Sequence, residues 1–325
     1  MSKQFDATIA LQLDILRASE GVSRDVIAIL KKLEKELIGK IASDNLTEWG
    51  RARVNKQLKE ARELIQRYYD QIAVKSIADT DDIARLAASV TASSISSAAV
   101  LPTAAVLDRI ATEAVIQGAA QGAWWQKQAA DVQFKFAAAV RQGLAGAETN
   151  QQIVQRVREV MDVSKRNAAT LVQTSTATIA NDARAAAMAA NDDLILAYRA
   201  VATLDSKTCL TCAPLDGLEW TKAGKPIGGH KFPLPSYPIH MNCRCLLLGR
   251  VLDGEPGGTR ASTDGQVSAA LTFEGWLERQ PIERQNDILG KGRAELYRKG
   301  TITLQDLVSG RGRPLTIEQL KARYT

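Results

Sequence analysis

Apolar residues recur at alternating steps of three and four in two stretches near the N-terminus. The first stretch places one such series on a single side of a helix: Val26, Leu30, Leu33, Leu37 and Ile41. The second does the same with Leu58, Ala61, Ile65, Tyr68 and Ile72. The segment GKIASDNLTEWG, residues 39–50, separates the two. The pattern predicts two long amphipathic helices that form a hairpin within the chain, or that associate through heptad-like seams with a second copy or another protein.

The alanine-rich residues from 77 to about 191 predict further helices. The acidic run IADTDD, residues 77–82, has the charge expected at a helix start, and a helical zone follows to Gln142, where the glycines of QGLAG end it. The segment TNQQ, residues 149–152, has the form of a capping box that opens a short helix. Ser164 is then placed to cap the next helix, which runs to about Asn191.

From Tyr198 onwards the pattern becomes strand-like. AYRAVATLD is typical of a strand and CRCLLLGRVL of a returning strand, with turn-forming segments between them. DGEPGGTRASTDG, residues 253–265, has the composition of a flexible linker. The tail from Thr272 is amphipathic and basic, with ten Lys and Arg against six Asp and Glu over residues 275–325.

These patterns together predict a mostly α fold with a small α+β module. Four parts follow along the chain: an N-terminal helical hairpin or extension over 1–78, an alanine-rich helical domain over 79–200, a Cys/His module with a β-rich segment over 201–250, and a linker with a basic helical tail over 251–325. The chain of 325 residues is long enough for one large domain or two modest ones.

Composition narrows the possible environments of the protein. The net charge of +6 permits contact with a polyanion such as DNA but does not require it. The N-terminal residues lack the pattern of a secretory signal, and the uncharged run Leu86–Leu107 contains too many Ser and Thr residues for a membrane span. We therefore expect no membrane partner and a reducing cytoplasm, where clustered thiols bind metal more often than they form disulfides.

All four cysteines and one of the two histidines lie in two short clusters. The spacing is C-x2-C, then 27 residues, then H-x2-C-x-C. A zinc ion prefers four soft ligands at the corners of a tetrahedron, and five donors are present: Cys209, Cys212, His240, Cys243 and Cys245. Because Cys243 and Cys245 lie two apart on a predicted strand, they share a face. We favour the four cysteines as ligands of a structural zinc ion, with His240 as a substitute or a group behind the ligands.

Two other interpretations of the cluster stay open at this point. The thiols could pair as disulfides after exposure to an oxidising medium, or they could be plain buried residues. The segment between the clusters has few large apolar residues, so a metal ion or a covalent crosslink would provide much of its order. The second histidine, His230, follows two glycines and is expected in a loop.

The candidate residues give little support to catalysis. A zinc deaminase would carry His-x-Glu, and neither His230 nor His240 is followed by that pattern. His240 near Cys243 could form a nucleophile pair, but the neighbouring ligands favour a structural role. Asp205, Asp216 and Glu219 are expected as turn formers or surface charges. We expect no enzymatic activity.

Two motifs carry a resemblance to a known family. LDSKTCLTCAPLDGLEW and PSYPIHMNCRCLLLG closely resemble the head-morphogenesis domain of tailed bacteriophages, the family of the Mu F protein and the SPP1 gene 7 product. The matching positions are Asp205, Cys209, Cys212, 215–217, His240 and 242–245. The predicted helical segment that precedes the cysteine motifs, from about residue 130, and the tail to residue 325 are also similar to the family. One departure is VQTSTA, where members often carry Arg-Thr-Glu.

The resemblance implies a minor capsid protein that associates with the portal and the head interior and aids procapsid assembly, DNA packaging or ejection. Implied partners are the portal protein, the major capsid or scaffold protein and, without sequence specificity, the packaged DNA. Self-association through the N-terminal helices is a further expectation. The implied location is the virion, after assembly in the host cytoplasm. The alternative from another class is a virion-delivered effector, a hydrolase or transferase that uses the Cys/His segment.

Overall fold

The structure is a computed structural model that describes residues 2–42, 50–251 and 257–324. Over these residues it is mostly helical with small antiparallel sheets, which confirms the predicted fold class. The helices are α1 Ser2–Ala42, α2 Arg51–Ile95, α3 Ala104–Glu113, α4 Gln121–Ala145, α5 Asn150–Ala189, α6 Phe273–Glu278, α7 Ile282–Leu289, α8 Lys291–Arg298 and α9 Ile317–Tyr324. The strands are β1 Val115–Ile116, β2 Ala119–Ala120, β3 Ala197–Val201, β4 Glu219–Thr221, β5 Pro226–Ile227, β6 Leu246–Arg250, β7 Thr259–Ser262 and β8 Gly265–Ser268.

The chain divides into two compact units. The helical unit contains residues 15–84 and 105–179, and the mixed unit contains residues 1–14, 85–104 and 180–325. The long helices α1, α2 and α5 each contribute residues to both units. The four-part division proposed from the sequence stays a prediction. No helix among the described residues is long and apolar enough to cross a membrane.

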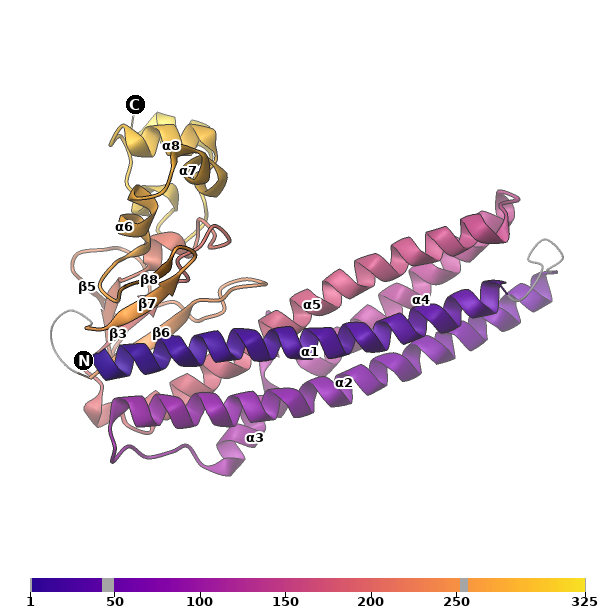
Figure 1. The fold of residues 1–325 in the computed structure, drawn as a ribbon, viewed down its shortest axis with the longest axis horizontal. Helices are drawn as coiled ribbons and strands as arrows, with labels where there is room; N and C mark the ends of the chain where they lie inside the picture. The colour runs from indigo at the N-terminus through magenta and orange to yellow at the C-terminus, as the bar shows by residue number, and fades with distance from the viewer. Residues whose placement is uncertain (1, 43–49, 252–256, 325) are drawn as a thin grey trace. The chain divides into compact units, whose positions relative to one another are not determined.

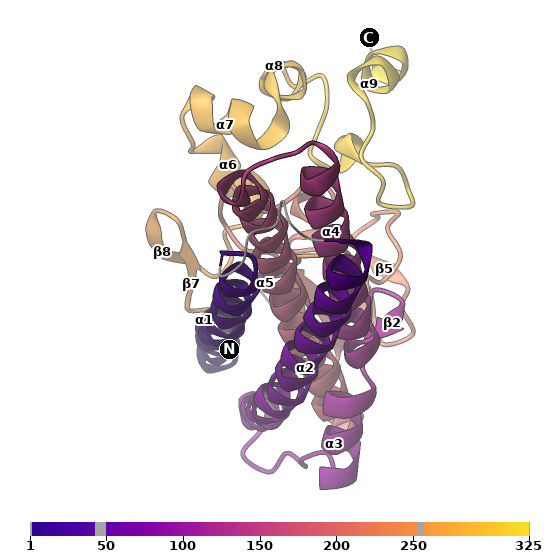
Figure 2. The ribbon, with the colours of Figure 1, turned by 90° about the vertical axis from the view of Figure 1, so that its right-hand side faces the viewer.

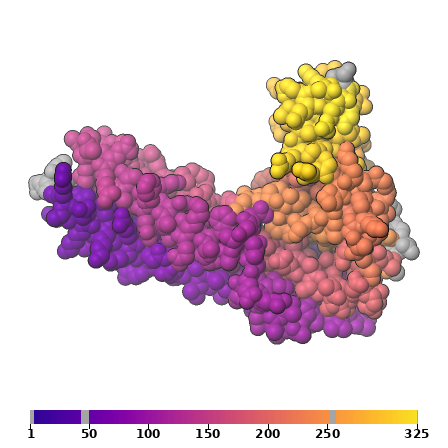
Figure 3. All heavy atoms as spheres, turned by 180° about the vertical axis from the view of Figure 1, so that it is seen from behind, coloured from indigo at the N-terminus to yellow at the C-terminus, as the bar shows by residue number. Residues whose placement is uncertain are grey.

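The helical unit is a bundle built from α1, α2, α4 and α5. Figure 1 shows these helices running along one another, and Figure 2 shows them from the end. On the face drawn in Figure 3 their side chains form a closely packed surface. The predicted seam of α1 is buried throughout, from Val26 to Ile41. The seam of α2 is confirmed except at one position, because Tyr69 is fully buried and Tyr68 is not.

Polar contacts between helices show that the bundle encloses these seams within one chain. Lys165 of α5 lies 2.6 Å from Glu34 of α1, and the hydroxyl groups of Tyr69 in α2 and Ser164 in α5 lie 2.6 Å apart in the interior. The α1 and α2 helices therefore pack against α4 and α5 as well as against each other.

Two predicted helix starts are wrong, and one is confirmed. Helix α2 runs through 77–82 without a break, because the Thr80 hydroxyl donates to the carbonyls of Ser76 and Ile77 in its own helix rather than capping a new one. Helix α5 likewise runs through Ser164. The capping box is present as predicted: the Gln152 amide nitrogen donates to Thr149 Oγ1 at 3.3 Å, and the Thr149 amide nitrogen donates to Gln152 Oε1 at 2.8 Å.

The mixed unit is organised around a four-stranded antiparallel sheet in the order β5-β4-β3-β6. Both predicted strands are present, as β3 and β6, and they pair over five residues each. The placement of Cys243 and Cys245 on the returning strand is wrong, because β6 begins at Leu246 and both cysteines precede it. One face of the sheet contributes Ala200 and Trp220 to a core that contains the cysteines. The other face packs Val201 and neighbouring β6 residues against Phe5 of α1, whose first turns lie beside β3 and β6 in Figure 1.

The predicted linker at 253–265 is wrong for its described part. Residues 252–256 lie outside the described residues, but Thr259–Ser268 form the antiparallel hairpin β7-β8. The reason is Arg260, whose guanidinium is buried and donates to both oxygens of Asp216, at 3.0 and 3.1 Å, and to the Ala202 carbonyl. Asp216 also accepts from the amide nitrogens of Ala202 and Phe273 at 2.7 Å each. One buried ion pair thus connects β3, β7 and α6.

The tail is helical, as predicted, but in short helices. The α6 to α9 segments bury a core of their own that includes Phe273, Trp276 and Leu277 and extends to Leu204 and Ala213 beside the first cysteine cluster. The tail is therefore packed against the Cys/His module rather than appended to it.

The interior contact of Ser164 gives a testable consequence. Ser164→Ala leaves the Tyr69 hydroxyl buried without its partner, so we expect a loss of about 1–3 kcal/mol in the free energy of unfolding. The double variant Ser164→Ala/Tyr69→Phe removes both polar groups and should recover most of that loss. Circular dichroism during thermal or urea unfolding of the full chain measures both. An unchanged stability in the single variant, or no recovery in the double variant, would contradict the assigned contact.

Candidate metal centre

Two turns bring the cysteine clusters together beside the sheet. The first follows β3: the amide nitrogens of Cys212 and Ala213 donate to the Cys209 carbonyl at 3.1 and 3.0 Å, so that both thiols of the C-x2-C motif point to one side. The second precedes β6: the Cys243 amide nitrogen donates to the His240 carbonyl at 3.1 Å. Asn242 between them takes a left-handed conformation with φ of 61°, which asparagine tolerates better than most residues.

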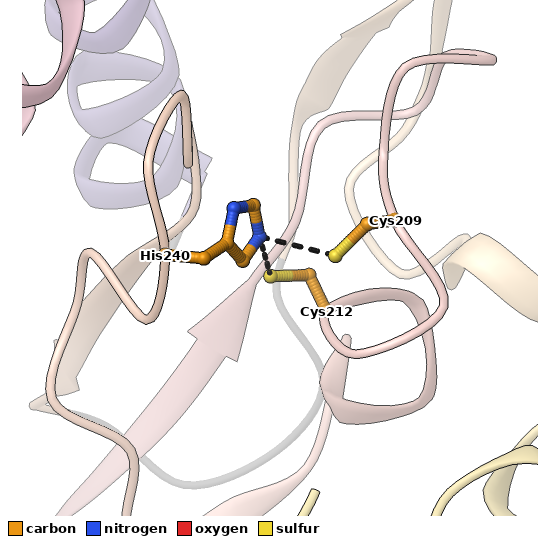
Figure 4. A group of neighbouring side chains, drawn as sticks. All are labelled: Cys209, Cys212 and His240. Carbon is orange, nitrogen blue, oxygen red and sulfur yellow. Dashed lines mark hydrogen bonds between the residues drawn. The ribbon is translucent and has the colours of Figure 1, made fainter. Parts of the chain in front are cut away.

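The five donor atoms form two overlapping groups. In the first, His240 Nε2 lies 3.0 Å from Cys209 Sγ and 3.4 Å from Cys212 Sγ, as Figure 4 shows. In the second, Cys212 lies with Cys243 and Cys245, and the Cys212 and Cys243 sulfurs are 3.8 Å apart. Donor atoms within each group are no more than 4.8 Å from one another. Cys212 belongs to both groups and is the centre of the cluster.

The imidazole of His240 is oriented for ligation. Its Nδ1 lies 2.7 Å from the Met241 carbonyl, which can only accept, so Nδ1 carries the proton of the neutral ring. In this neutral form, the one that binds metal, the lone pair is on Nε2, the atom that faces the thiols. A backbone carbonyl behind a metal-binding histidine commonly fixes the ring in this way.

The cluster fits a zinc ion by donor chemistry and by spacing. Zinc–sulfur bonds of about 2.3 Å in a tetrahedron separate neighbouring sulfurs by about 3.8 Å. The Cys212–Cys243 sulfur separation is 3.8 Å, and the two sulfur–nitrogen distances in the first group are shorter, at 3.0 and 3.4 Å. All four cysteines are free thiols in the structure. The choice of four ligands among the five donors stays a prediction.

Without metal, the contacts within the cluster shift the pKa values of its thiols and of His240. The hydrogen bond from Cys212 and the contact with His240 lower the pKa of Cys209 to about 4, although burial acts in the opposite direction. The same contact with Cys209, together with Cys243, raises the pKa of His240 to about 11. Hydrogen bonds with Cys212 and Cys245 lower the pKa of Cys243, whereas hydrogen bonds with Cys209, Cys243 and Cys245 raise that of Cys212. The cluster therefore contains thiolates that could bind a cation.

An ion pair connects the two cysteine segments. Arg244, between two cysteines, donates from both terminal nitrogens to Asp205, at 2.5 and 2.8 Å. Asp205 also accepts from the amide nitrogen of Lys207 at 2.9 Å and so shapes the turn that leads to Cys209. Burial raises the pKa of Asp205, but the hydrogen bonds from Arg244 outweigh this effect and the pKa is lowered. The paired charges fix the distance between the two segments even where no ligand connects them.

Residues 134–248 match the family model described as phage Mu protein F like protein. This part of the chain is similar to the Mu F-like family. The family predicted from the two cysteine motifs is thereby confirmed over a match that includes the end of α4, all of α5 and the entire cluster. The predicted likeness of the tail beyond residue 248 stays a prediction. No curated protein and no solved structure matches the chain.

Side chains of α1 and α5 donate hydrogen bonds to backbone carbonyls of the second cysteine segment of the Mu F-like module. The Gln12 side-chain amide donates to the Arg244 carbonyl at 2.9 Å, and that of Asn181 donates to the Cys245 carbonyl at 3.3 Å. Arg184, fully buried, donates to the Gln12 and Asn181 side-chain oxygens at 2.7 and 3.5 Å. Burial lowers the pKa of Arg184 to about 10. The polar network orients the backbone on which Cys243 and Cys245 are placed.

The departure from the family pattern at VQTSTA leaves the helix intact. Thr174 and Thr178 are buried in α5, and their hydroxyl groups donate to backbone carbonyls of the same helix. Thr174 donates to the Thr170 carbonyl at 2.7 Å, and Thr178 donates to the Thr174 carbonyl at 2.9 Å. The hydroxyl groups of Ser175 and Thr176 in the same stretch are buried and have no hydrogen-bond partner among the described residues.

Three other sequence expectations have mixed outcomes. His230 lies in a loop as expected, where its Nε2 donates to the Glu219 carbonyl at 2.8 Å, and it is not part of the cysteine cluster. Asp205 shapes a turn, but its pairing with Arg244 was missed. Asp216 is not a surface charge, because its carboxylate is buried with Arg260. The sequence contained a signal for both ion pairs. Acidic residues flank the C-x2-C motif, and the arginines at 244 and 260 follow later in the chain.

The Asp205–Arg244 pair predicts a pH-dependent contribution to stability. Asp205→Asn should lower the free energy of unfolding by about 2 kcal/mol, the scale of a hydrogen bond to a charged group. Because the pKa of Asp205 is depressed in the folded protein, its contribution is complete above about pH 4, the unfolded value, and is lost as the pH falls through the folded value. Urea unfolding of the metal-free, reduced protein should therefore show the wild-type advantage shrinking only below about pH 4.

The exposed variant Glu295→Gln is the control, since that carboxylate pairs with Lys299 in solvent and should leave the unfolding midpoint unchanged. An equal stability of wild type and Asp205→Asn at neutral pH would show that the pair does not stabilise the module.

Proposed function

We propose that this protein is a minor head protein of a tailed bacteriophage, a structural component that associates with the portal and the head interior. The family match over residues 134–248 supports this proposal, because the family is that of head-morphogenesis proteins. In this role the protein aids procapsid assembly or the packaging and ejection of DNA. Its location is the virion, after assembly in the host cytoplasm.

The partners follow from the same proposal. The portal protein and the major capsid or scaffold protein are the protein partners, and the packaged DNA is a non-specific one, for which the net charge of +6 provides attraction to phosphates. Self-association through the N-terminal helices would have to use their outer faces, since the seams are buried in the bundle.

We further propose that the cysteine cluster holds one structural zinc ion. Closing the loop between the clusters costs a few kcal/mol of chain entropy. A zinc–thiolate site can supply on the order of 10 kcal/mol, and a disulfide about 2–4 kcal/mol. The observation that carries the zinc proposal is the arrangement of His240 and the thiols: the Nε2 atom of His240 lies 3.0 Å from Cys209 Sγ, and the sulfurs of Cys212 and Cys243 lie 3.8 Å apart.

Location in the virion is the direct test of the function. Quantitative mass spectrometry of purified phage should find the protein in heads at few copies per portal ring, and phage with a nonsense codon in its gene should yield fewer DNA-filled heads by electron microscopy. The protein found only in host cytoplasm, with normal heads in its absence, would contradict the proposal.

Zinc analysis of the protein purified under reducing conditions tests the metal site. We expect about one zinc per chain. Cys212→Ser should abolish it, because Cys212 belongs to both donor groups. His240→Ala distinguishes a site of four cysteines from one in which His240 is a ligand. Retained zinc indicates that the four cysteines are the ligands, and lost zinc indicates that His240 is one of them. His230→Gln, at the histidine outside the cluster, is the control and should retain zinc.

Zinc-free protein that resists proteases equally before and after reduction would contradict both metal and disulfide. The effector alternative has one supporting feature, the Cys209–His240 contact of 3.0 Å, which a nucleophile pair would also show. Rapid alkylation of Cys209 by iodoacetamide in a zinc-free protein would favour that alternative, whereas protection of all four thiols by bound zinc would oppose it.

A further inference from the structure

The segment SGRGRP, residues 309–314, forms a loop in the tail before α9. It lies outside the family match and contributes no donor to the proposed metal site. Its exposed residues are Gly310, Arg311, Arg313 and Pro314. No Asp or Glu occurs in the loop, so it carries two positive charges and no negative one.

Two backbone hydrogen bonds fold the loop into a tight turn. The Ser309 amide nitrogen donates to the Arg313 carbonyl, and the Gly312 amide nitrogen donates to the Ser309 carbonyl, both at 2.8 Å. Gly312 has a φ of 73°, a left-handed conformation that glycine adopts without steric cost. The turn thus presents Arg311 and Arg313 with only a glycine between them.

The base of the loop is fixed in the core of the tail. Val308 pairs with Pro314, and the Leu315 amide nitrogen donates to the Leu307 carbonyl at 2.8 Å. The side chains of Leu307, Val308 and Leu315 are buried. A ligand that binds the loop therefore meets a backbone that is already ordered, which lowers the entropy cost of binding.

Neither arginine side chain is used inside the protein. The guanidinium groups of Arg311 and Arg313 have no hydrogen bond or ion pair with any residue that the structure describes. Asp306, the acidic residue that precedes the loop, accepts instead from the Thr303 amide nitrogen at 2.9 Å and from the Tyr324 hydroxyl at 2.6 Å. The loop therefore offers two unpaired guanidinium groups to an anionic partner.

We propose that this loop binds duplex DNA by inserting Arg311 and Arg313 into the minor groove of A·T-rich segments. The inference rests on the proposed function for its partner, the packaged DNA, and adds the surface and a sequence preference. The minor groove is about 6 Å wide, which favours a narrow loop over a helix. No atom lies within 4 Å of where a Cβ would stand on Gly310, so backbone can approach the groove there.

The chemistry of the arginines favours this groove over other anionic partners. The minor groove of A·T-rich DNA is narrow and strongly negative, and it attracts inserted arginines. Single-stranded nucleic acid is bound chiefly by aromatic stacking, and residues 309–314 contain no aromatic side chain. An acidic protein surface would form exposed ion pairs with the two arginines, and such pairs contribute little.

Fluorescence anisotropy of labelled duplexes with the full chain tests the proposal, at about 0.15 M salt. Three duplexes of about 12 base pairs, just over one helical turn, serve as probes: one with an A·T centre, one with a G·C centre, and one with an inosine·cytosine centre. Inosine lacks the guanine N2 amino group, so its pair with cytosine presents only acceptors in the minor groove, as A·T does. We expect the A·T and inosine duplexes to bind about equally, and roughly tenfold more tightly than the G·C duplex.

Variants of the loop separate groove insertion from general attraction. Arg311→Gln should weaken binding of the A·T duplex roughly fivefold to tenfold. The double variant Arg311→Lys/Arg313→Lys keeps the charge and should lose most of the A·T preference, because an ammonium group is more strongly hydrated than a guanidinium. Arg279→Gln, at an exposed arginine that caps α6, changes the net charge by the same amount as Arg311→Gln and should leave the preference unchanged.

Several outcomes would overturn the proposal. Equal binding of the three duplexes, or an equal effect of Arg279→Gln and Arg311→Gln, would reduce the binding to general electrostatics. An inosine duplex that binds as weakly as the G·C duplex would exclude reading in the minor groove. Tighter binding of oligothymidylate would assign the loop to single strands, and more effective competition by polyglutamate than by unlabelled A·T duplex would assign it to an acidic protein.

These results are distinct from those that test the proposed function. A protein that is present in heads but shows no A·T preference would contradict the loop assignment alone. A protein that binds the A·T duplex but is absent from heads would contradict the proposed function alone.

Discussion

The meeting of four thiols and one imidazole at the junction of two turns is the constraint on which the Mu F-like module depends. Each turn is short, and the two turns meet on one core around the cysteines. The core around the cysteines consists of a few large side chains, among them Trp220, Phe232 and Tyr237, and the cysteines themselves. A cation that binds these donors would add to the packing that connects the two turns.

Polar contacts around the donors set their geometry. The Asp205–Arg244 pair fixes the approach of one turn to the other, and Gln12, Asn181 and Arg184 hold the carbonyls of the second turn. The buried Asp216–Arg260 pair extends the same support to the hairpin and to α6. Each of these contacts joins residues distant in the chain, and the module, the first turns of α1 and the tail belong to one compact unit.

Periodicity and short motifs predicted the elements whose causes are local. The α1 and α2 seams, the capping box at Thr149, strands β3 and β6 and the cysteine motifs all have a signal within a few residues. The failures have distant causes. Ser164 looked like a cap because serine prefers that position, but Tyr69 of another helix satisfies its hydroxyl. The segment after residue 257 looked like a linker because its anchors are distant in the chain: Arg260 binds a carboxylate 44 residues earlier, and the Thr259 amide nitrogen donates to Asp6.

X-ray absorption at the zinc edge is the most direct test of the central claim, because it reports the ligand atoms themselves. For protein purified under reducing conditions we expect a four-coordinate first shell dominated by sulfur at about 2.3 Å, with no nitrogen if the four cysteines bind and one nitrogen at about 2.0 Å if His240 replaces one of them. A first shell of oxygen and nitrogen alone, or a protein that folds fully without stoichiometric zinc, would contradict the account.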